Sequence, residues 1–496
     1  MNICVLDIGT TSTRGIVYDE KMVMIGSHQV RTGPVYLDSV RVEQNPDIWE
    51  KAINEIFAVL RQNKVTYSAI VVTAQRSSVI PVDSEGKALA DAVMWQDKRT
   101  EAYCRSLDQY EDVVYARTGL RIRPIYAAPK MAWFMDNRKS IHKRVWKYMV
   151  IPDYIIYLLT GEAVTDHTYG NRTLLMDMEK CRWDEELLDI FHLDEKYLCR
   201  LIEPGSLCGF TREGIPVYSA GGDQQCSALG LGVMKSGDAE ITHGTGSFLM
   251  AGTDSPVYDS SRKISCNVSA VPGKYLLEAS VMTTGILYDW FRENFYEGMP
   301  DYERINSDVI QSQPGAGGVI MLPHFQGSGS PDWNVDAKGI FFNLSLKTKR
   351  RDMARAVLEG IAVEVDRSIH RVEELAGDIK YITVSGGLSA LKEFNQLQAD
   401  IYNKEIVSYG DSQATAAGAW ISCSVSAGLY KSFEEAADIA AGSRQKNSFL
   451  PCRENRECYE AVKRHSNSLY SALKDHGIYS EFKEEENING NQGRER

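Results

Sequence analysis

Two distant stretches of the chain share one pattern, and this repetition constrains the fold more than any other feature. Residues 3–6 are apolar, a turn rich in glycine and hydroxyl side chains covers residues 8–15, and residues 16–18 are apolar again. Residues 239–251 repeat this order around Gly244-Thr245-Gly246-Ser247. Each stretch predicts a strand, a tight turn and a returning strand. The repetition predicts two related lobes, each with a glycine-rich turn at a strand end.

The first turn has the chemistry of a phosphate cradle. Glycine lets the backbone approach a ligand closely, and Thr10, Thr11 and Ser12 add hydroxyl donors to the backbone N–H groups. Arg14 supplies a permanent cation. Asp7, at the end of the strand, can hold a hydrated Mg²⁺. Taken alone, the turn is explained equally well as the soluble tip of a hairpin, so the rest of the chain must decide.

Length and charge limit the classes that remain. A chain of 496 residues is too long for one ordinary core. The polar break at residues 235–238 predicts lobes over 1–234 and 235–480, followed by a polar, disordered tail over 481–496. The net charge of −12 argues against nucleic acid as a partner. Because there is no apolar run of about 20 residues and no signal-peptide pattern, we expect a cytoplasmic protein without a membrane partner.

Along the rest of the chain, apolar runs alternate with helical periodicity, which favours an α/β fold with a mixed sheet covered by helices. The predicted strands are residues 22–25, 68–72, 217–220 and 381–384, and the predicted helical stretches begin at Pro46, extend from Lys130 to about Phe191, and begin again near Ala390.

A second candidate site follows the strand at 217–220. Gly221 and Gly222 present Asp223 at the strand end, followed by Gln224 and Gln225. A carboxylate placed there can accept the proton of a substrate hydroxyl while its oxygen attacks phosphorus. The alternative is that Asp223 only caps the N-terminus of a helix. The five residues alone leave both interpretations open.

Three glycine-containing turns in order make the pattern more specific. Asp7 with Thr10 and Thr11, then Gly244-Thr245-Gly246, then Gly386-Gly387 resemble the phosphate-1, phosphate-2 and adenosine motifs of the superfamily that contains actin, hexokinase and the heat-shock chaperones. This resemblance implies an α/β fold of two ribonuclease H-like lobes, of the actin-like ATPase kind, with ATP and substrate in a cleft between them.

Within this superfamily, the chain is similar to the FGGY family of carbohydrate kinases from Asp7 to about Tyr430. The supporting stretches are residues 7–15, 95–100, 130–134, 221–225, 244–246, 327–333 and 385–388. Ile125, Ala127 and Asn343 depart from the family signatures, which indicates a divergent subgroup. Among known members the likeness is to glycerol kinases.

The resemblance also implies site residues. An acceptor pocket would be lined by Arg76, Trp95, Tyr126, Asp223, Gln224 and Phe248, with Ser77 where glycerol kinases have a glutamate. A nucleotide would contact Thr10, Thr11, Ser12, Arg14, Thr245, Gly285 and Gly387, and Asp7 would hold the metal. Asp289 and Leu391 replace amide side chains near the nucleotide. Because serine is shorter than glutamate and uncharged, the pocket would admit a longer polyol or a ketose.

We therefore predict an enzyme that uses ATP and Mg²⁺ to phosphorylate a hydroxyl of a small polyol or ketose, with Asp223 as the general base. The first alternative is a xylulokinase-type ketopentose kinase. The second is an ATP-driven conformational module like actin or the chaperones, which share the fold but need no acceptor pocket. The sequence leaves the oligomeric state open, with a homodimer as one candidate, and His243 is interpreted as structural.

Overall fold

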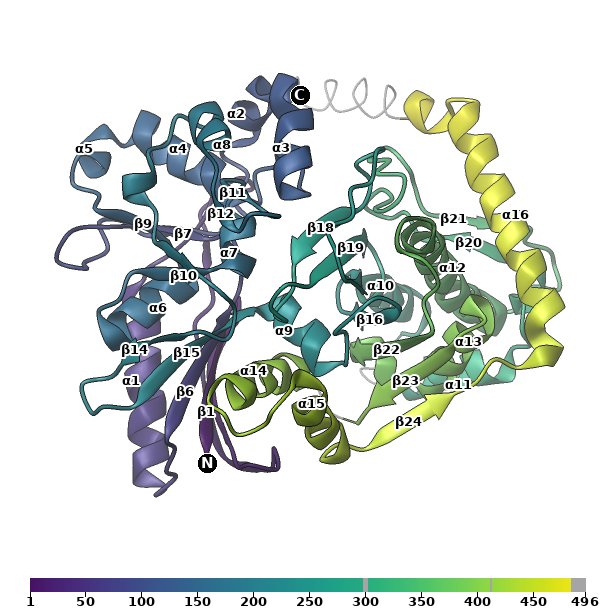
Figure 1. Cartoon of the computed structure of the whole chain (residues 1–496). Coiled ribbons are helices and arrows are strands. Elements are labelled where there is room, and N and C mark those ends of the chain that lie inside the picture. Colours follow the sequence, from purple (N-terminus) through teal and green to yellow (C-terminus); the bar gives the residue numbers. More distant parts are fainter. Residues whose placement is uncertain (298–301, 411–412, 483–496) are drawn as a thin grey trace. The chain divides into compact units, whose positions relative to one another are not determined.

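The computed structural model describes residues 1–297, 302–410 and 413–482, which form two compact units (Figure 1). The first unit contains residues 1–236, 252–277 and 413–445. The second contains the described residues within 237–251, 278–412 and 446–496. The chain thus first changes unit after Ser236, inside the polar break, and two later segments belong to the first unit. Apart from Glu481 and Phe482, the tail predicted over 481–496 lies outside the described residues.

A six-stranded sheet forms the centre of the first unit. Its strands lie in the order β14 (Leu207–Phe210), β15 (Pro216–Gly222), β6 (Ala69–Ala74), β1 (Ile3–Ile8), β2 (Ser12–Tyr18) and β3 (Met24–Arg31). β1 pairs antiparallel with β2 and parallel with β6, which pairs parallel with β15. All residues of β1 and β6 are buried, as their continuous apolar runs predict.

Alternate residues of these strands pack against helices on opposite faces. Leu6 and Ile8 lie in one cluster with α1 (Asp47–Gln62) and α6 (Ile151–Thr160). Ile3 and Val5 lie in another with α9 (Asp223–Gly230), α14 (Ala414–Ser426) and α15 (Phe433–Gly442). The segment 413–445 therefore completes the core of the first unit.

Two glycines bring α9 and α14 close together (Figure 1). A Cβ atom on Gly418 would lie 1.8 Å from the carbonyl oxygen of Cys226, and one on Gly230 would lie 2.0 Å from that of Ala414. Since both neighbours are backbone atoms, no side chain fits at either position. The helix that begins at Asp223, α9, is thus packed with its backbone directly against the backbone of α14.

The remainder of the first unit combines short strands and helices. Residues 130–191 were predicted as mainly helical and contain four short strands as well. The strands are β4 (Val35–Tyr36), β5 (Val42–Gln44), β7 (Val79–Val82), β8 (Ala92–Val93), β9 (Lys147–Val150), β10 (Val164–Asp166), β11 (Met176–Asp177), β12 (Arg182–Trp183), β13 (Arg200–Ile202) and β18 (Ser265–Val268); the helices are α2 (Glu101–Ser106), α3 (Glu111–Thr118), α4 (Ala127–Asn137), α5 (Lys139–His142), α7 (His167–Asn171) and α8 (Glu185–Ile190).

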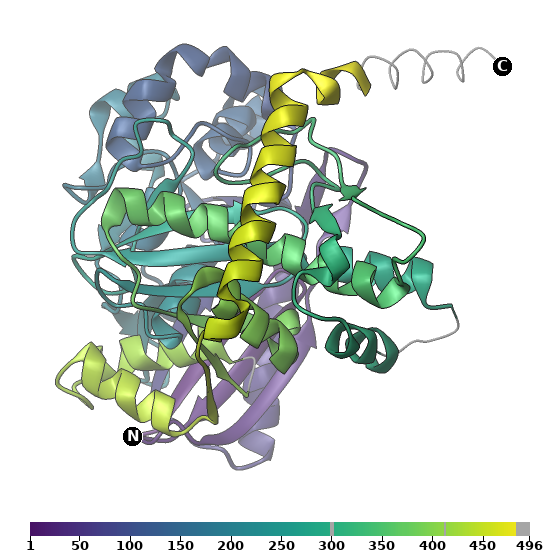
Figure 2. The same cartoon turned by 90° about the vertical axis from the view of Figure 1, so that its right-hand side faces the viewer.

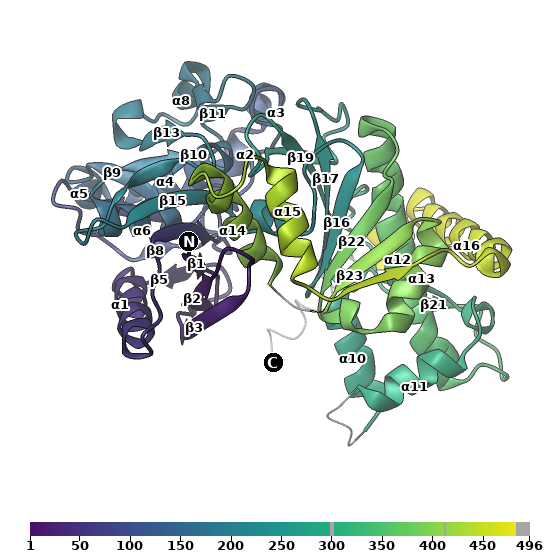
Figure 3. The same cartoon turned by 60° about the horizontal axis from the view of Figure 1, so that its bottom comes forward.

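The second unit repeats the strand pattern of the first (Figure 3). β16 (Asp238–His243) pairs antiparallel with β17 (Ser247–Thr253) and parallel with β22 (Tyr381–Gly386), as β1 does with β2 and β6. β22 also pairs parallel with β23 (Glu405–Tyr409), which pairs antiparallel with the last strand of the sheet, β24 (Lys446–Phe449). The repetition predicted from the sequence is confirmed at the level of strand direction.

Helices and two further strands complete the second unit. They are α10 (Gly285–Phe295), α11 (Glu303–Gln311), β20 (Ile320–Leu322), β21 (Ile340–Phe342), α12 (Arg350–Ala376), α13 (Lys392–Tyr402) and α16 (Arg456–Asp475), while β19 (Tyr275–Val281) begins in the first unit and ends in the second. Figure 2 faces α16, in yellow, which packs on α12 and α13 through buried residues such as Tyr459, Val462 and Tyr470. Among the described helices, none has the length and apolarity needed to cross a membrane.

Candidate active site

The first turn and its flanking strands hold five of the predicted residues, and a sixth, Trp95, contacts the turn. Asp7 and Arg14 lie opposite each other on β1 and β2, and a guanidinium nitrogen of Arg14 contacts Oδ2 of Asp7. The indole Nε1 of Trp95 donates to Oγ1 of Thr10 at 3.1 Å. Thr11 is exposed and Ser12 half-buried. The turn thus presents hydroxyl groups next to a cation whose charge is balanced by a buried carboxylate.

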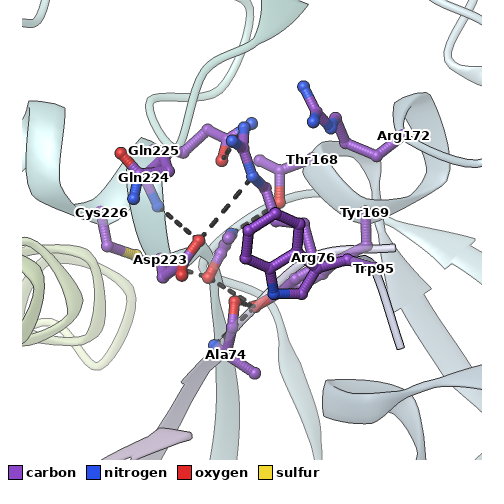
Figure 4. Close-up of polar contacts among 12 residues, drawn as sticks. Ala74, Arg76, Trp95, Thr168, Tyr169, Arg172, Asp223, Gln224, Gln225 and Cys226 are labelled. Atoms are coloured by element: carbon purple, nitrogen blue, oxygen red, sulfur yellow. Dashed lines mark hydrogen bonds and ion pairs between the residues drawn. The ribbon is translucent and has the colours of Figure 1, made fainter. Parts of the chain in front are cut away.

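The strand end that carries Asp223 is fixed by hydrogen bonds to its backbone (Figure 4). Gly221 has a φ of +114°, which favours glycine, and the pairing of β15 with β6 shifts register at this point. The carbonyl of Gly221 accepts from Thr73 Oγ1 and Tyr169 OH, both at 2.8 Å, and Thr168 Oγ1 accepts from the N–H of Gly222 at 2.9 Å. The orientation of the following residue is therefore set by its neighbours.

Asp223 is the first residue of α9, and Gly222 is the N-cap. Oδ1 of Asp223 accepts from the N–H of Gln224 at 2.8 Å and lies 3.7 Å from Nε of Arg76. Burial raises the pKa of Asp223 to about 6, and Arg76 opposes that rise. A carboxylate with this pKa is ionised at neutral pH and is still a stronger base than an ordinary aspartate.

Arg76 and Ser77 follow β6 after one intervening residue, Gln75. Nη1 of Arg76 donates to Oε1 of Gln225 at 3.4 Å. Ser77 is buried with a φ of +68°, and within the part of the chain that the structure describes its Oγ has no hydrogen-bond partner. The hydroxyl of Ser77 therefore has a hydrogen-bonding capacity that no described residue uses.

Arg172 is a neighbour of this site that the sequence analysis missed. Its guanidinium lies 4.8 Å from the centre of the Tyr126 ring, its Nη1 donates to Oδ1 of Asn267 at 3.0 Å, and its charge lowers the pKa of Asp223 (Figure 4). Residues 168–178, including Arg172, are all buried. The signal available in the sequence was therefore a single arginine within a stretch whose other members are mostly small or apolar.

The other predicted nucleotide residues lie together in the second unit. Thr245, Gly285 and Gly387 line one cavity of about 760 Å³, along with Asp289 and Leu391. The N–H of Gly285, which begins α10, donates to the carbonyl of Gly244 at 3.0 Å, so the helix starts at the second glycine-rich turn. Phe248 belongs to β17, in the second unit.

His243 also lines this cavity, but its ring nitrogens are occupied. Nδ1 pairs with Oγ of Ser247 at 2.7 Å and Nε2 with Oε1 of Gln398 at 2.8 Å. Burial lowers the pKa of His243 to about 4, so the ring is neutral at physiological pH. This is the geometry of a structural histidine.

Comparison with known proteins decides the family. The models for the FGGY family of carbohydrate kinases match residues 2–230 with the N-terminal domain and residues 239–427 with the C-terminal domain. The chain belongs to this family. As predicted, this FGGY kinase is an enzyme that transfers a phosphoryl group from ATP to an alcohol group, and its fold is that of two actin-like ATPase lobes.

Relatives and solved structures agree with this assignment. The kinase is 33% identical to a glycerol kinase from Thermococcus gammatolerans, covering 87% of this chain and 90% of the relative, and 31% identical to one from Aquifex aeolicus, covering 92% and 97%. Its fold is similar to xylulose kinase from Lactobacillus acidophilus, with a TM-score of 0.89 and 23% identity over 97% of this chain and 99% of the other. The fold is also similar to that of Plasmodium falciparum glycerol kinase with ADP, with a TM-score of 0.88 and 24% identity over 94% of this chain and 97% of the other.

Proposed function

We propose that this FGGY kinase phosphorylates a hydroxyl of a small polyol or ketose, as its glycerol kinase relatives suggest, with Asp223 as the general base. The observation that carries the proposal is the position of Asp223, fixed at the start of α9 beside Arg76 with a pKa of about 6. Proton acceptance by a carboxylate of this kind makes the substrate oxygen a better nucleophile as it attacks the γ-phosphorus.

The other residues have distinct roles in this proposal. Arg76 and Gln224 hold the acceptor hydroxyls near Asp223, and Trp95 and Tyr126 shape the pocket. Thr10, Thr11, Ser12 and Arg14 receive the phosphates of ATP, because hydroxyls and a guanidinium match phosphate oxygens. Arg172 keeps the ring of Tyr126 in place through its cation–π contact. In the second unit, Thr245, Gly285 and Gly387 contact the nucleotide, and Phe248 contributes to the acceptor pocket.

A Mg²⁺ ion fits the first turn. Mg²⁺ in kinases is bound by one or two carboxylates together with water and phosphate oxygens. Asp7 offers such a carboxylate, buried at the end of β1, and no cluster of three or more His, Cys, Asp or Glu suited to a metal occurs among residues 1–297, 302–410 and 413–482. When bound, the ion would offset negative charge on the β- and γ-phosphates of ATP during phosphoryl transfer.

Ser77 supports an acceptor longer than glycerol. Where glycerol kinases place a glutamate, this chain has a buried hydroxyl that accepts and donates no hydrogen bond among the described residues. A fourth or fifth hydroxyl of a tetritol, pentitol or ketopentose would give it a partner and would occupy the space that a glutamate fills.

The experiment is an ADP-release assay with ATP and a panel of glycerol, tetritols, pentitols and ketopentoses. We expect ADP release to require an acceptor and a four- or five-carbon acceptor to exceed glycerol in kcat/KM. Ser77→Glu should shift the preference toward glycerol. Lys64→Glu is the control, because Lys64 is exposed and has a similar φ of +58°. Hydrolysis of ATP that ignores the acceptor would overturn the kinase proposal, and a wide preference for glycerol would overturn the role of Ser77.

A further inference from the structure

The cavity of the second unit extends along α10 beyond the glycine-rich turn. Gly285 begins the helix at the turn, and Asp289 lies one helical turn later on the same side of α10. Both residues line the cavity, about 6 Å apart along the helix axis. A nucleotide whose phosphates occupy the turn at Gly244 and Thr245 therefore reaches Asp289 with its more distant end.

Asp289 is held in position by an aromatic pair. The hydroxyl of Tyr302 donates to Oδ1 of Asp289. The ring of Tyr302 stacks on that of Tyr288, with centres 6.1 Å apart and planes inclined by 10°, and the hydroxyl of Tyr288 donates to Oδ1 of Asn306 at 2.7 Å. All four residues line the cavity. Oδ2 of Asp289 accepts from no other residue in the described ranges, so it is available to a ligand.

The chemistry of this carboxylate selects for a donor. An ionised aspartate only accepts hydrogen bonds. On a purine base the exocyclic amine is such a donor: adenine carries one at C6 and guanine carries one at C2. Hypoxanthine has neither amine but donates through N1–H, whereas unsubstituted purine has no donor at C2, N1 or C6. Leu388 and Leu391 line the same cavity and offer apolar surface to a flat ring.

We propose that Asp289, positioned by Tyr302, accepts a hydrogen bond from the exocyclic amine of the nucleotide's base, and thereby discriminates against purine nucleotides whose base has no donor on this edge. The inference rests on the proposed function, because it requires that the phosphates lie at the turn of Gly244 and Thr245. In this proposal Asp289 is the residue that recognises the base, whereas the glycine-rich turns contact the phosphates, which all nucleotides share.

The test is calorimetric binding of ADP, GDP and purine riboside 5′-diphosphate, whose base has no hydrogen-bond donor, to the whole protein without an acceptor. We expect the purine riboside diphosphate to bind about tenfold more weakly than the amine-bearing nucleotide with which it is compared, since a hydrogen bond to a charged group has roughly that effect. If only ADP binds more tightly than the purine riboside diphosphate, the donor is the 6-amine; if only GDP does, the donor lies on the 2-amine edge; if both do, either amine reaches Asp289. Asp289→Ala should reduce the preference to less than about threefold, and Tyr302→Phe should reduce it in part.

Asp308→Asn is the matched control. Asp308 is a carboxylate of α11 that accepts from Tyr296 OH at 2.7 Å, and it is not one of the cavity-lining residues. Its variant should keep the wild-type preference, and a thermal melt of each variant checks folding. Equal binding of all three nucleotides, or an unchanged preference in Asp289→Ala, overturns this inference alone. Failure to bind any nucleotide overturns the proposed function together with it.

Discussion

Nε of Arg76 lies 3.7 Å from Oδ1 of Asp223, so the guanidinium acts on the carboxylate through its charge without a close hydrogen bond (Figure 4). Burial raises the pKa of Asp223, and Arg76 is the largest influence in the other direction. This balance keeps the carboxylate ionised near neutral pH while it retains useful basicity. Two predictions depend on it directly.

Replacement of the base should separate binding from turnover. Asp223→Asn has almost the same shape but cannot accept the hydroxyl proton, so we expect kcat to fall by about 10²- to 10⁴-fold. Binding of ADP, measured by calorimetry, should change less than about threefold. Asp194→Asn is the control, because Asp194 is an exposed carboxylate of the same unit. Near-normal turnover in Asp223→Asn would remove this residue from the mechanism.

The pH profile should report the same carboxylate. Because the protonated form of Asp223 cannot act as a base, kcat should rise with pH, pass its midpoint near the pKa of about 6, and become constant above it. Arg76→Met removes the cation that lowers this pKa, so the midpoint should move to higher pH by about one unit. Steady-state rates between pH 5 and 9 measure both profiles. A midpoint that stays in place, or moves to lower pH, would show that another group controls the rate.

The close packing of α9 and α14 should be sensitive to one methyl group. Gly418→Ala places a Cβ atom against the carbonyl oxygen of Cys226, and we expect a loss of about 2–3 kcal/mol in the free energy of unfolding. Gly442→Ala is the matched control, since Gly442 ends a helix of the same unit and a Cβ there meets nothing within 4 Å. The control should be neutral or more stable by up to about 1 kcal/mol. Urea unfolding followed by circular dichroism compares the two.

Glu240 should make stability depend on pH. It is fully buried on β16, and burial raises its pKa from 4.5 to about 8 in the folded protein. Between these values the unfolded chain releases a proton that the folded chain keeps, so stability should fall as pH rises from about 4.5 to about 8. Glu240→Gln should flatten this decline and be the more stable protein at pH 8. Unfolding midpoints at several pH values test this, with Glu374→Gln, an exposed position of the same unit, as the control.

Local patterns were sufficient to predict three central strands of the first unit. The apolar runs at 3–6, 68–72 and 217–220 became β1, β6 and β15, because strands buried on both faces need continuous apolar sequence. The return of 413–445 to the first unit was not predictable in this way. It depends on the contact of α14 with α9, which joins residues nearly 200 positions apart and leaves only small residues as a trace in the sequence.

The candidate site shows the same limit. Asp223 was predicted as a site residue because glycines precede it at a strand end, and Thr10 and Arg14 because they share one turn. Arg172 lies over the ring of Tyr126 and its charge lowers the pKa of Asp223, and neither relationship has a fixed spacing along the chain. Tyr302 was missed for a similar reason, since its contact with Asp289 joins two helices.

The place of 413–445 in the first unit also determines when that unit can finish folding during synthesis. Trp420, which is completely buried and donates through Nε1 to the carbonyl of Asp19 at 3.2 Å, covers the sheet face formed by Ile3 and Val5. The ribosome makes Ile3 long before it makes Trp420. Residues 1–236 therefore emerge with an apolar face that stays uncovered until 413–445 follows, and we expect residues 1–236 expressed alone to leave this face exposed.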